Sequence, residues 1–130
     1  PVGRYSGTVD EQFVPYTVPQ ENGNKTGVRW VSLTGADGAG LMAASLGAQG
    51  PWDHDGGLLS VSAHHHTVAG LTQAKRLPDL PRVDDIVLHL DYAQSGLGSA
   101  SCGPGRLEKY KLPAEPAEFS VGMRAVNCEL

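Results

Sequence analysis

The chain has 130 residues, of which 40% are hydrophobic and 18% charged, and its formal net charge is −4. The ten Lys and Arg residues are scattered, without the basic run typical of nucleic-acid binding. The sequence has no apolar stretch near the ~20 residues that a membrane-spanning helix requires. We therefore expect one globular domain over residues 1–130, with neither nucleic acid nor a membrane as partner.

Seventeen glycines and nine prolines separate short apolar runs, which is typical of an all-β chain. In chain order, we expect extended segments over 12–18, 27–34, 41–46, 58–63, 86–92, 107–112 and 118–126. Thr67 is positioned to cap one short helix over 68–75, because its hydroxyl can accept a free backbone N–H. Composition and pattern together predict an antiparallel β-sandwich with at most one short helix.

Two polar segments that adjoin the strand predicted over 58–63 are candidate sites. In a continued strand over 58–63, His64 and His66 would share a face, as paired metal ligands do. A solvated triplet is the commoner explanation, so we predict no metal site. The loop Trp52-Asp53-His54-Asp55 combines an aromatic ring with carboxylates, as sugar sites do, although a solvated loop is the simpler explanation.

The two cysteines, Cys102 and Cys128, form no C-x-x-C pair and fit no zinc pattern. We interpret both as free thiols in a reducing compartment, which predicts a cytoplasmic location. The sequence leaves a single Cys102–Cys128 disulfide open.

A glycine-rich stretch, Gly96-Leu97-Gly98-Ser99-Ala100-Ser101-Cys102-Gly103-Pro104-Gly105, follows the strand predicted over 86–92. Glycine permits positive φ and the close approach of another group, so this stretch predicts a shaped loop. Loops on a rigid sheet often carry binding residues, although a β-turn without function is common for such punctuation.

The stretch Pro15-Tyr16-Thr17-Val18-Pro19-Gln20-Glu21-Asn22-Gly23, followed by Arg29-Trp30, resembles a signature of large bacterial β-galactosidases of glycoside hydrolase family 2. That signature lies in their C-terminal, small-chain domain. Later landmarks are similar: Leu-His-Leu-Asp, then Gly-Leu-Gly and Ser-Cys-Gly-Pro. The resemblance runs from about 3 to 126. It implies part of a galactose-mutarotase-like supersandwich and a fragment of a longer C-terminal domain, with strand edges left uncovered.

The resemblance implies a parent enzyme that hydrolyses terminal non-reducing β-D-galactose residues by a retaining mechanism at two glutamates. Those glutamates belong to a barrel outside this chain, so we expect no catalytic residue here and no activity of the isolated chain. This piece would wall the substrate pocket and support assembly into a homo-oligomer. We expect no cofactor in this chain; magnesium and sodium sites of the parent would lie elsewhere.

The resemblance also assigns a substrate-binding role to the glycine-rich loop. Cys102 stands where other members of the family carry a tryptophan that reaches the active site, and another branch of the family has cysteine there. The substrate-binding residues expected in this loop are Gly98, Ser99, Ser101 and Cys102.

Two alternatives remain open. The first is a non-catalytic carbohydrate-binding or structural β-sandwich module. The second is a mutarotase-like enzyme that uses His and Glu, which ranks last because no His/Glu pair here matches that family's motif.

Overall fold

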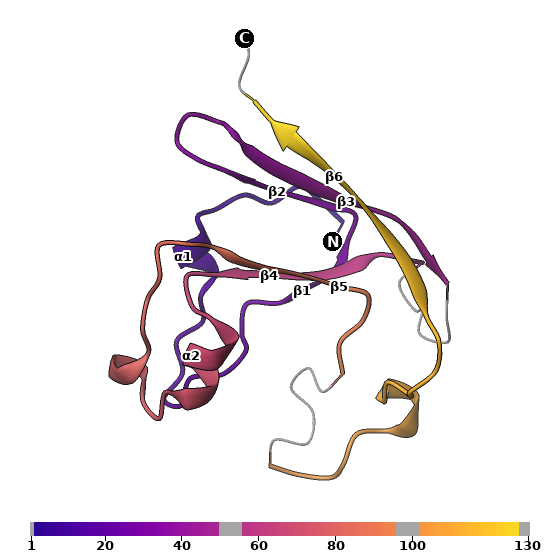
Figure 1. The fold of residues 1–130 in the computed structure, drawn as a ribbon. Helices are drawn as coiled ribbons and strands as arrows, with labels where there is room; N and C mark the ends of the chain where they lie inside the picture. The colour runs from indigo at the N-terminus through magenta and orange to yellow at the C-terminus, as the bar shows by residue number, and fades with distance from the viewer. Residues whose placement is uncertain (1, 50–55, 96–101, 128–130) are drawn as a thin grey trace. The chain divides into compact units, whose positions relative to one another are not determined.

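The computed structural model describes residues 2–49, 56–95 and 102–127, and these residues form two three-stranded sheets (Figure 1). One sheet has the strand order β1-β4-β5 and the other has the order β2-β3-β6. The strands are β1 (Lys25–Val28), β2 (Trp30–Thr34), β3 (Gly40–Gln49), β4 (Leu59–His64), β5 (Val87–Asp91) and β6 (Glu118–Val126). The helices are α1 (Val9–Gln12), α2 (Val68–Gln73) and the 3-10 turns η1 (Leu77–Asp79) and η2 (Glu108–Tyr110). The all-β, antiparallel class predicted from the sequence is confirmed.

The chain divides into two compact units, each with its own buried apolar residues. The first unit comprises Pro1–Lys25 and Val61–His89, and its buried side chains are Val61, Leu71 and Ala74. The second comprises Thr26–Ser60 and Leu90–Leu130, with Ala43 and Leu59 buried.

In the second unit, β3 is the middle strand of an antiparallel sheet, and Figure 1 shows it beside β6. Its Ala43 pairs with Val31 of β2 and with Met123 of β6, and this alanine is almost fully buried. Met123 is 64% exposed, and β6 is an outer strand of the sheet within the described residues. The bounds predicted for this last strand are confirmed, but its apolar side chains are largely exposed.

A β-bulge interrupts the pairing of β3 with β6 between Ser45 and Gly47. The Ser45 hydroxyl accepts the N–H of Gly47 at 3.2 Å and donates to the carbonyl of Gly57. Gly47 has a φ of 114°, a conformation that side chains rarely adopt, so glycine suits this bulged position.

In the first unit, the structure confirms the helix cap predicted at Thr67. Its hydroxyl accepts the N–H of Gly70 at 3.0 Å, and α2 begins at Val68. A Cβ at Gly70 would lie 3.3 Å from the ring of Pro81, so the glycine allows this proline to pack closely against the helix. This packing offsets the low helix propensity of glycine.

Three of the predicted elements were wrong. The segment predicted as extended over 12–18 forms no strand. A second short helix, α1, ends at Gln12, because Thr8 and Glu11 form a capping box, so the described residues hold more than the one short helix predicted. The strand predicted over 27–34 is divided at Arg29, where the chain leaves one sheet and enters the other. The segment 107–112 contains η2 instead of a strand.

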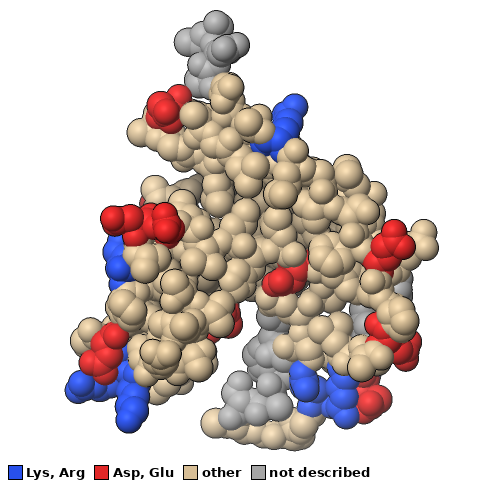
Figure 2. Space-filling view, in the orientation of Figure 1, with Lys and Arg blue, Asp and Glu red and all other residues tan. Residues whose placement is uncertain are grey.

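Figure 2 shows the Lys, Arg, Asp and Glu side chains in small groups. Among the residues that the structure describes, no helix is both long and apolar enough to span a membrane.

Candidate functional site

The glycine-rich loop predicted to bind substrate is described only from Cys102 onward. Gly98, Ser99 and Ser101 lie outside the described residues, as does the loop Trp52-Asp53-His54-Asp55. Cys102 is exposed and carries a free thiol.

Gly103 and Gly105 do not adopt the positive φ expected for glycines in a tight turn. A Cβ at either position would meet nothing within 4 Å. Neither crowding nor backbone conformation therefore requires glycine at these two positions.

Three contacts in the second unit lie on the segments that flank the loop. The Arg106 guanidinium donates to the Ser95 hydroxyl, so the two residues on either side of the loop are joined. Gln94 donates to the Asp91 carboxylate at 2.6 Å, at the end of β5. The Tyr92 ring stacks on Phe119 of β6, with 5.9 Å between the ring centroids. These contacts fix the base from which the loop leaves the sheet.

The sequence reasoning missed these flanking residues. The only local signal was an arginine directly after the last glycine of the loop, Arg106. A guanidinium is suited to hold neighbouring oxygen atoms with fixed geometry.

The three consecutive histidines do not share a strand face, because β4 ends at His64. Each ring hydrogen-bonds a different backbone carbonyl: His64 to that of Asn22 (2.8 Å), His65 to that of Val83 (3.0 Å) and His66 to that of Pro81 (2.8 Å). In the described part of the chain, no group of three or more His, Cys, Asp or Glu side chains could hold a metal ion. The triplet therefore contributes to the packing of the first unit.

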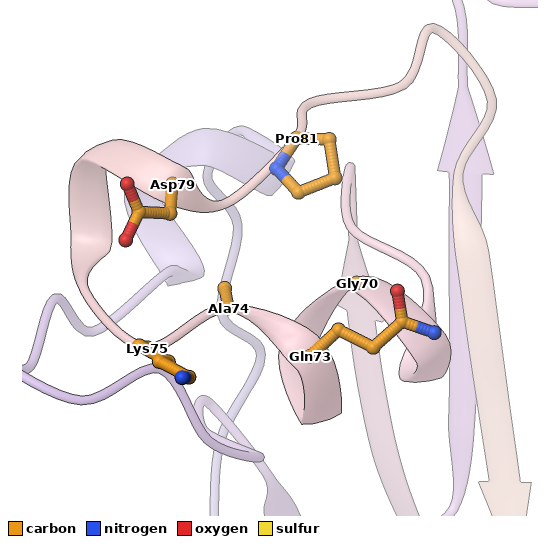
Figure 3. Close-up of a pocket in the computed structure, with 6 residues that line it drawn as sticks. All are labelled: Gly70, Gln73, Ala74, Lys75, Asp79 and Pro81. Atoms are coloured by element: carbon orange, nitrogen blue, oxygen red, sulfur yellow. The ribbon is translucent and has the colours of Figure 1, made fainter.

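A shallow pocket of about 340 Å³ lies in the first unit, beside α2 and η1. Figure 3 shows Asp79 and Pro81 on one side of it and Gln73 and Lys75 on the other. Both Asp79 oxygens accept hydrogen bonds from Arg76, at 3.1 and 3.2 Å, so this carboxylate is engaged in an ion pair. The lining residues are Gly70, Gln73, Ala74, Lys75, Asp79 and Pro81.

Two carboxyl groups of the first unit have a lowered pKa. Hydrogen bonds from the Arg82 guanidinium lower the pKa of Asp10. The backbone N–H of Thr8 donates to Glu11 at 2.6 Å and lowers the pKa of that carboxyl. A catalytic acid of a glycosidase needs a raised pKa, so neither group suits that role.

Comparison with known proteins gives the chain its family. The sequence matches the family described as "Beta galactosidase small chain" over residues 1–123. The chain therefore belongs to the β-galactosidase small-chain family, as the Pro-Gln-Glu-Asn-Gly signature predicted.

Several curated proteins named beta-galactosidase are similar to the chain. It is 34% identical over 124 residues to that of Arthrobacter sp. (strain B7), which covers 95% of this chain and 12% of that protein. It is 32% identical over 117 residues to that of Kluyveromyces lactis, covering 90% of this chain and 10% of that protein. It is 29% identical over 122 residues to that of Staphylococcus xylosus, covering 94% of this chain and 11% of that protein. The chain thus spans about a tenth of the length of these relatives.

Proposed function

We propose that this chain is the later part of the C-terminal, small-chain domain of a β-galactosidase. The parent enzyme hydrolyses terminal non-reducing β-D-galactose residues with retention of configuration. The family match over residues 1–123 is the observation that carries this proposal. The proposal includes a cytoplasmic location, a homo-oligomeric parent, and magnesium and sodium sites of the parent outside this chain.

Within that enzyme, the loop that contains Gly98, Ser99, Ser101 and Cys102 forms one wall of the substrate pocket. The exposed thiol of Cys102 supports this role, because this side chain is accessible to another surface. The contacts of Arg106 with Ser95, and of Tyr92 with Phe119, support a fixed position for the loop base. A cysteine there offers a small apolar wall and a weak S–H donor instead of an aromatic face.

The chain supplies no catalytic pair in this proposal. A retaining glycosidase uses two carboxyl groups about 5–5.5 Å apart, one of them a proton donor. The lowered pKa values of Asp10 and Glu11, and the ion pair of Asp79 with Arg76, are consistent with structural roles for these carboxylates.

The test is to express the complete open reading frame and the 130-residue chain side by side, and to assay both with a chromogenic β-galactoside. We expect turnover only by the longer protein. Turnover by the purified chain, abolished by replacing one of its carboxylates, would contradict the proposed division of roles. A longer protein that binds galactosides without hydrolysing them would favour the carbohydrate-binding alternative.

A further inference from the structure

The Pro-Gln-Glu-Asn-Gly motif lies in an irregular segment, residues 13–24, that is held in place by few hydrogen bonds. Asn22 folds this segment on itself: its side-chain oxygen accepts the N–H of Val14 at 2.9 Å, and its side-chain nitrogen donates to the Gln20 carbonyl at 3.0 Å. The segment contains neither helix nor strand. Its position in the first unit therefore depends on side chains from elsewhere in the chain.

His64, the last residue of β4, supplies one such contact. Its Nε2 donates to the backbone carbonyl of Asn22 at 2.8 Å, across 42 positions of sequence. His64 is only 3% exposed, and the Phe13 ring lies edge-on to its imidazole with 6.1 Å between the ring centroids. Both ends of the segment are thus in contact with this one ring.

Gly23 allows the close approach of the segment to His64. Its φ is 65°, and a Cβ there would lie 3.3 Å from the imidazole carbon Cε1 and 2.5 Å from the Gln12 carbonyl oxygen. The backbone conformation at Gly23 therefore allows the His64 imidazole to reach the Asn22 carbonyl.

The neutral ring is the form that fits this site. Because the Asn22 carbonyl can only accept, Nε2 carries the hydrogen, and a second proton would have to bind Nδ1. Nδ1 is buried and has no hydrogen-bond partner among the described residues. Protonation would therefore create a buried charge and a buried donor without an acceptor, both of which are costly.

Burial is the largest influence on the ring and lowers the pKa of His64. The hydrogen bond to the Asn22 carbonyl and the Glu21 carboxylate favour the charged form, whereas His66 and His89 oppose it. Burial outweighs the hydrogen bond, so protonation is opposed by loss of hydration and by the unpartnered Nδ1, although the Nε2–H donor itself is kept.

We propose that His64 is a pH-responsive latch: its neutral imidazole holds segment 13–24 on the end of β4, and protonation of the ring releases that segment. Burial lowers the pKa of His64 below its ordinary value of 6.5. At mildly acidic pH, the chain with the segment released then binds more protons at His64 than the chain with the segment docked. The stability that the neutral His64 gives to the docked segment is fully present above about pH 6.5 and decreases as the pH falls below that value. This proposal concerns the chain itself and does not depend on the proposed enzymatic role.

Hydrogen exchange of the 130-residue chain tests the latch. The Val14 amide reports the docked arrangement through Asn22, because it donates to the Asn22 side chain and the Asn22 backbone carbonyl accepts from His64. After correction for intrinsic exchange, we expect its protection to fall between about pH 7.5 and about pH 5, by up to about thirtyfold, which is the limit for a ring with an ordinary pKa of 6.5. Amides in the β3–β6 pairing should keep their protection over the same range. An equal loss in both places, or no loss at Val14, would overturn the proposal.

Two variants separate His64 from its neighbours. In His64→Gln, the side-chain amide can donate to Asn22 without titrating, so protection at Val14 should no longer depend on pH. His65→Gln is the matched control and should keep the dependence of the parent chain. If His64→Gln does not fold, an NMR titration of the His64 imidazole in the unmodified chain tests the proposal instead. A His64 ring that titrates at or above about pH 6.5 would contradict the latch.

Discussion

Arg82 donates to both carboxylate oxygens of Asp10, which lies 72 positions earlier in the sequence, and Nη2 lies 3.1 Å from Oδ2. This ion pair joins α1 to the segment after η1 within the first unit. Two parallel bonds from a guanidinium give such a pair a defined geometry. Both side chains are more than half exposed, so solvent screening keeps the gain in stability small.

Asp10→Asn should make the chain slightly less stable at neutral pH and less sensitive to acid. The folded pKa of Asp10 lies below its ordinary value of 3.8, so its contribution is present above that pH and is lost as the pH falls through the folded pKa. Urea midpoints at several pH values measure both effects. Asp79→Asn, which removes a local pair with Arg76, is the control. Because exposed pairs are screened, an Asp10→Asn effect that persists unchanged in high salt would contradict this account.

Gly23→Ala should be clearly destabilising. The new Cβ would lie 2.5 Å from the Gln12 carbonyl, at a φ of 65°. We expect a loss of about 1–3 kcal/mol in the free energy of unfolding, measured with urea. Gly103→Ala is the matched control, because a Cβ there meets nothing within 4 Å; its effect should stay within about 0.5 kcal/mol. Equal losses in the two variants would show that Gly23 is not a constrained position.

The sequence predicted best those elements whose signals are local. The last strand has the predicted bounds, Glu118–Val126, because apolar and polar residues alternate along it. The cap at Thr67 was also predicted correctly from one side chain. The helix Val9–Gln12 was missed although Thr8 and Glu11 form a recognisable capping box, because the helix is a single turn.

The contacts that shape the candidate sites could not be predicted in the same way. His64 meets Asn22 across 42 positions, and Arg106 meets Ser95 across a glycine-rich loop. Spacing along the chain carries no information on such pairs, since they depend on how strands and loops are placed in space. The family signature marked the motif around Asn22 without indicating which side chain holds it.

Leu59→Ala should cost much of the stability of the chain. Leu59 is 2% exposed on β4, and removing a buried leucine side chain costs about 2–5 kcal/mol through lost burial and the cavity left behind. Leu46→Ala is the control, since Leu46 is 71% exposed at the bulge of β3 and should lose about 0.5 kcal/mol or less. Thermal and urea unfolding measure the difference. A Leu46→Ala loss as large as that of Leu59→Ala would indicate that the exposed face is covered in solution.

The Cys102 thiol should react with a thiol reagent in the folded chain without denaturant, because its side chain is exposed and free. The variants Cys102→Ser and Cys128→Ser assign the signal, and loss of the fast reaction in Cys102→Ser is the expected result. Protection of Cys102 in the folded chain would indicate that the loop packs against the sheet and is structural.

Cys102→Trp tests the proposed pocket wall in the complete enzyme. A large ring in an exposed loop should change the melting temperature of the 130-residue chain very little, since no core packing is disturbed. In the complete enzyme, the same ring should change KM or the preference among acceptor sugars, because it would contact the leaving group of the substrate, the aglycone. Cys102→Ala is the control for loss of the thiol alone. Unchanged kinetics together with a large loss of stability would show that Cys102 supports the fold instead of the pocket.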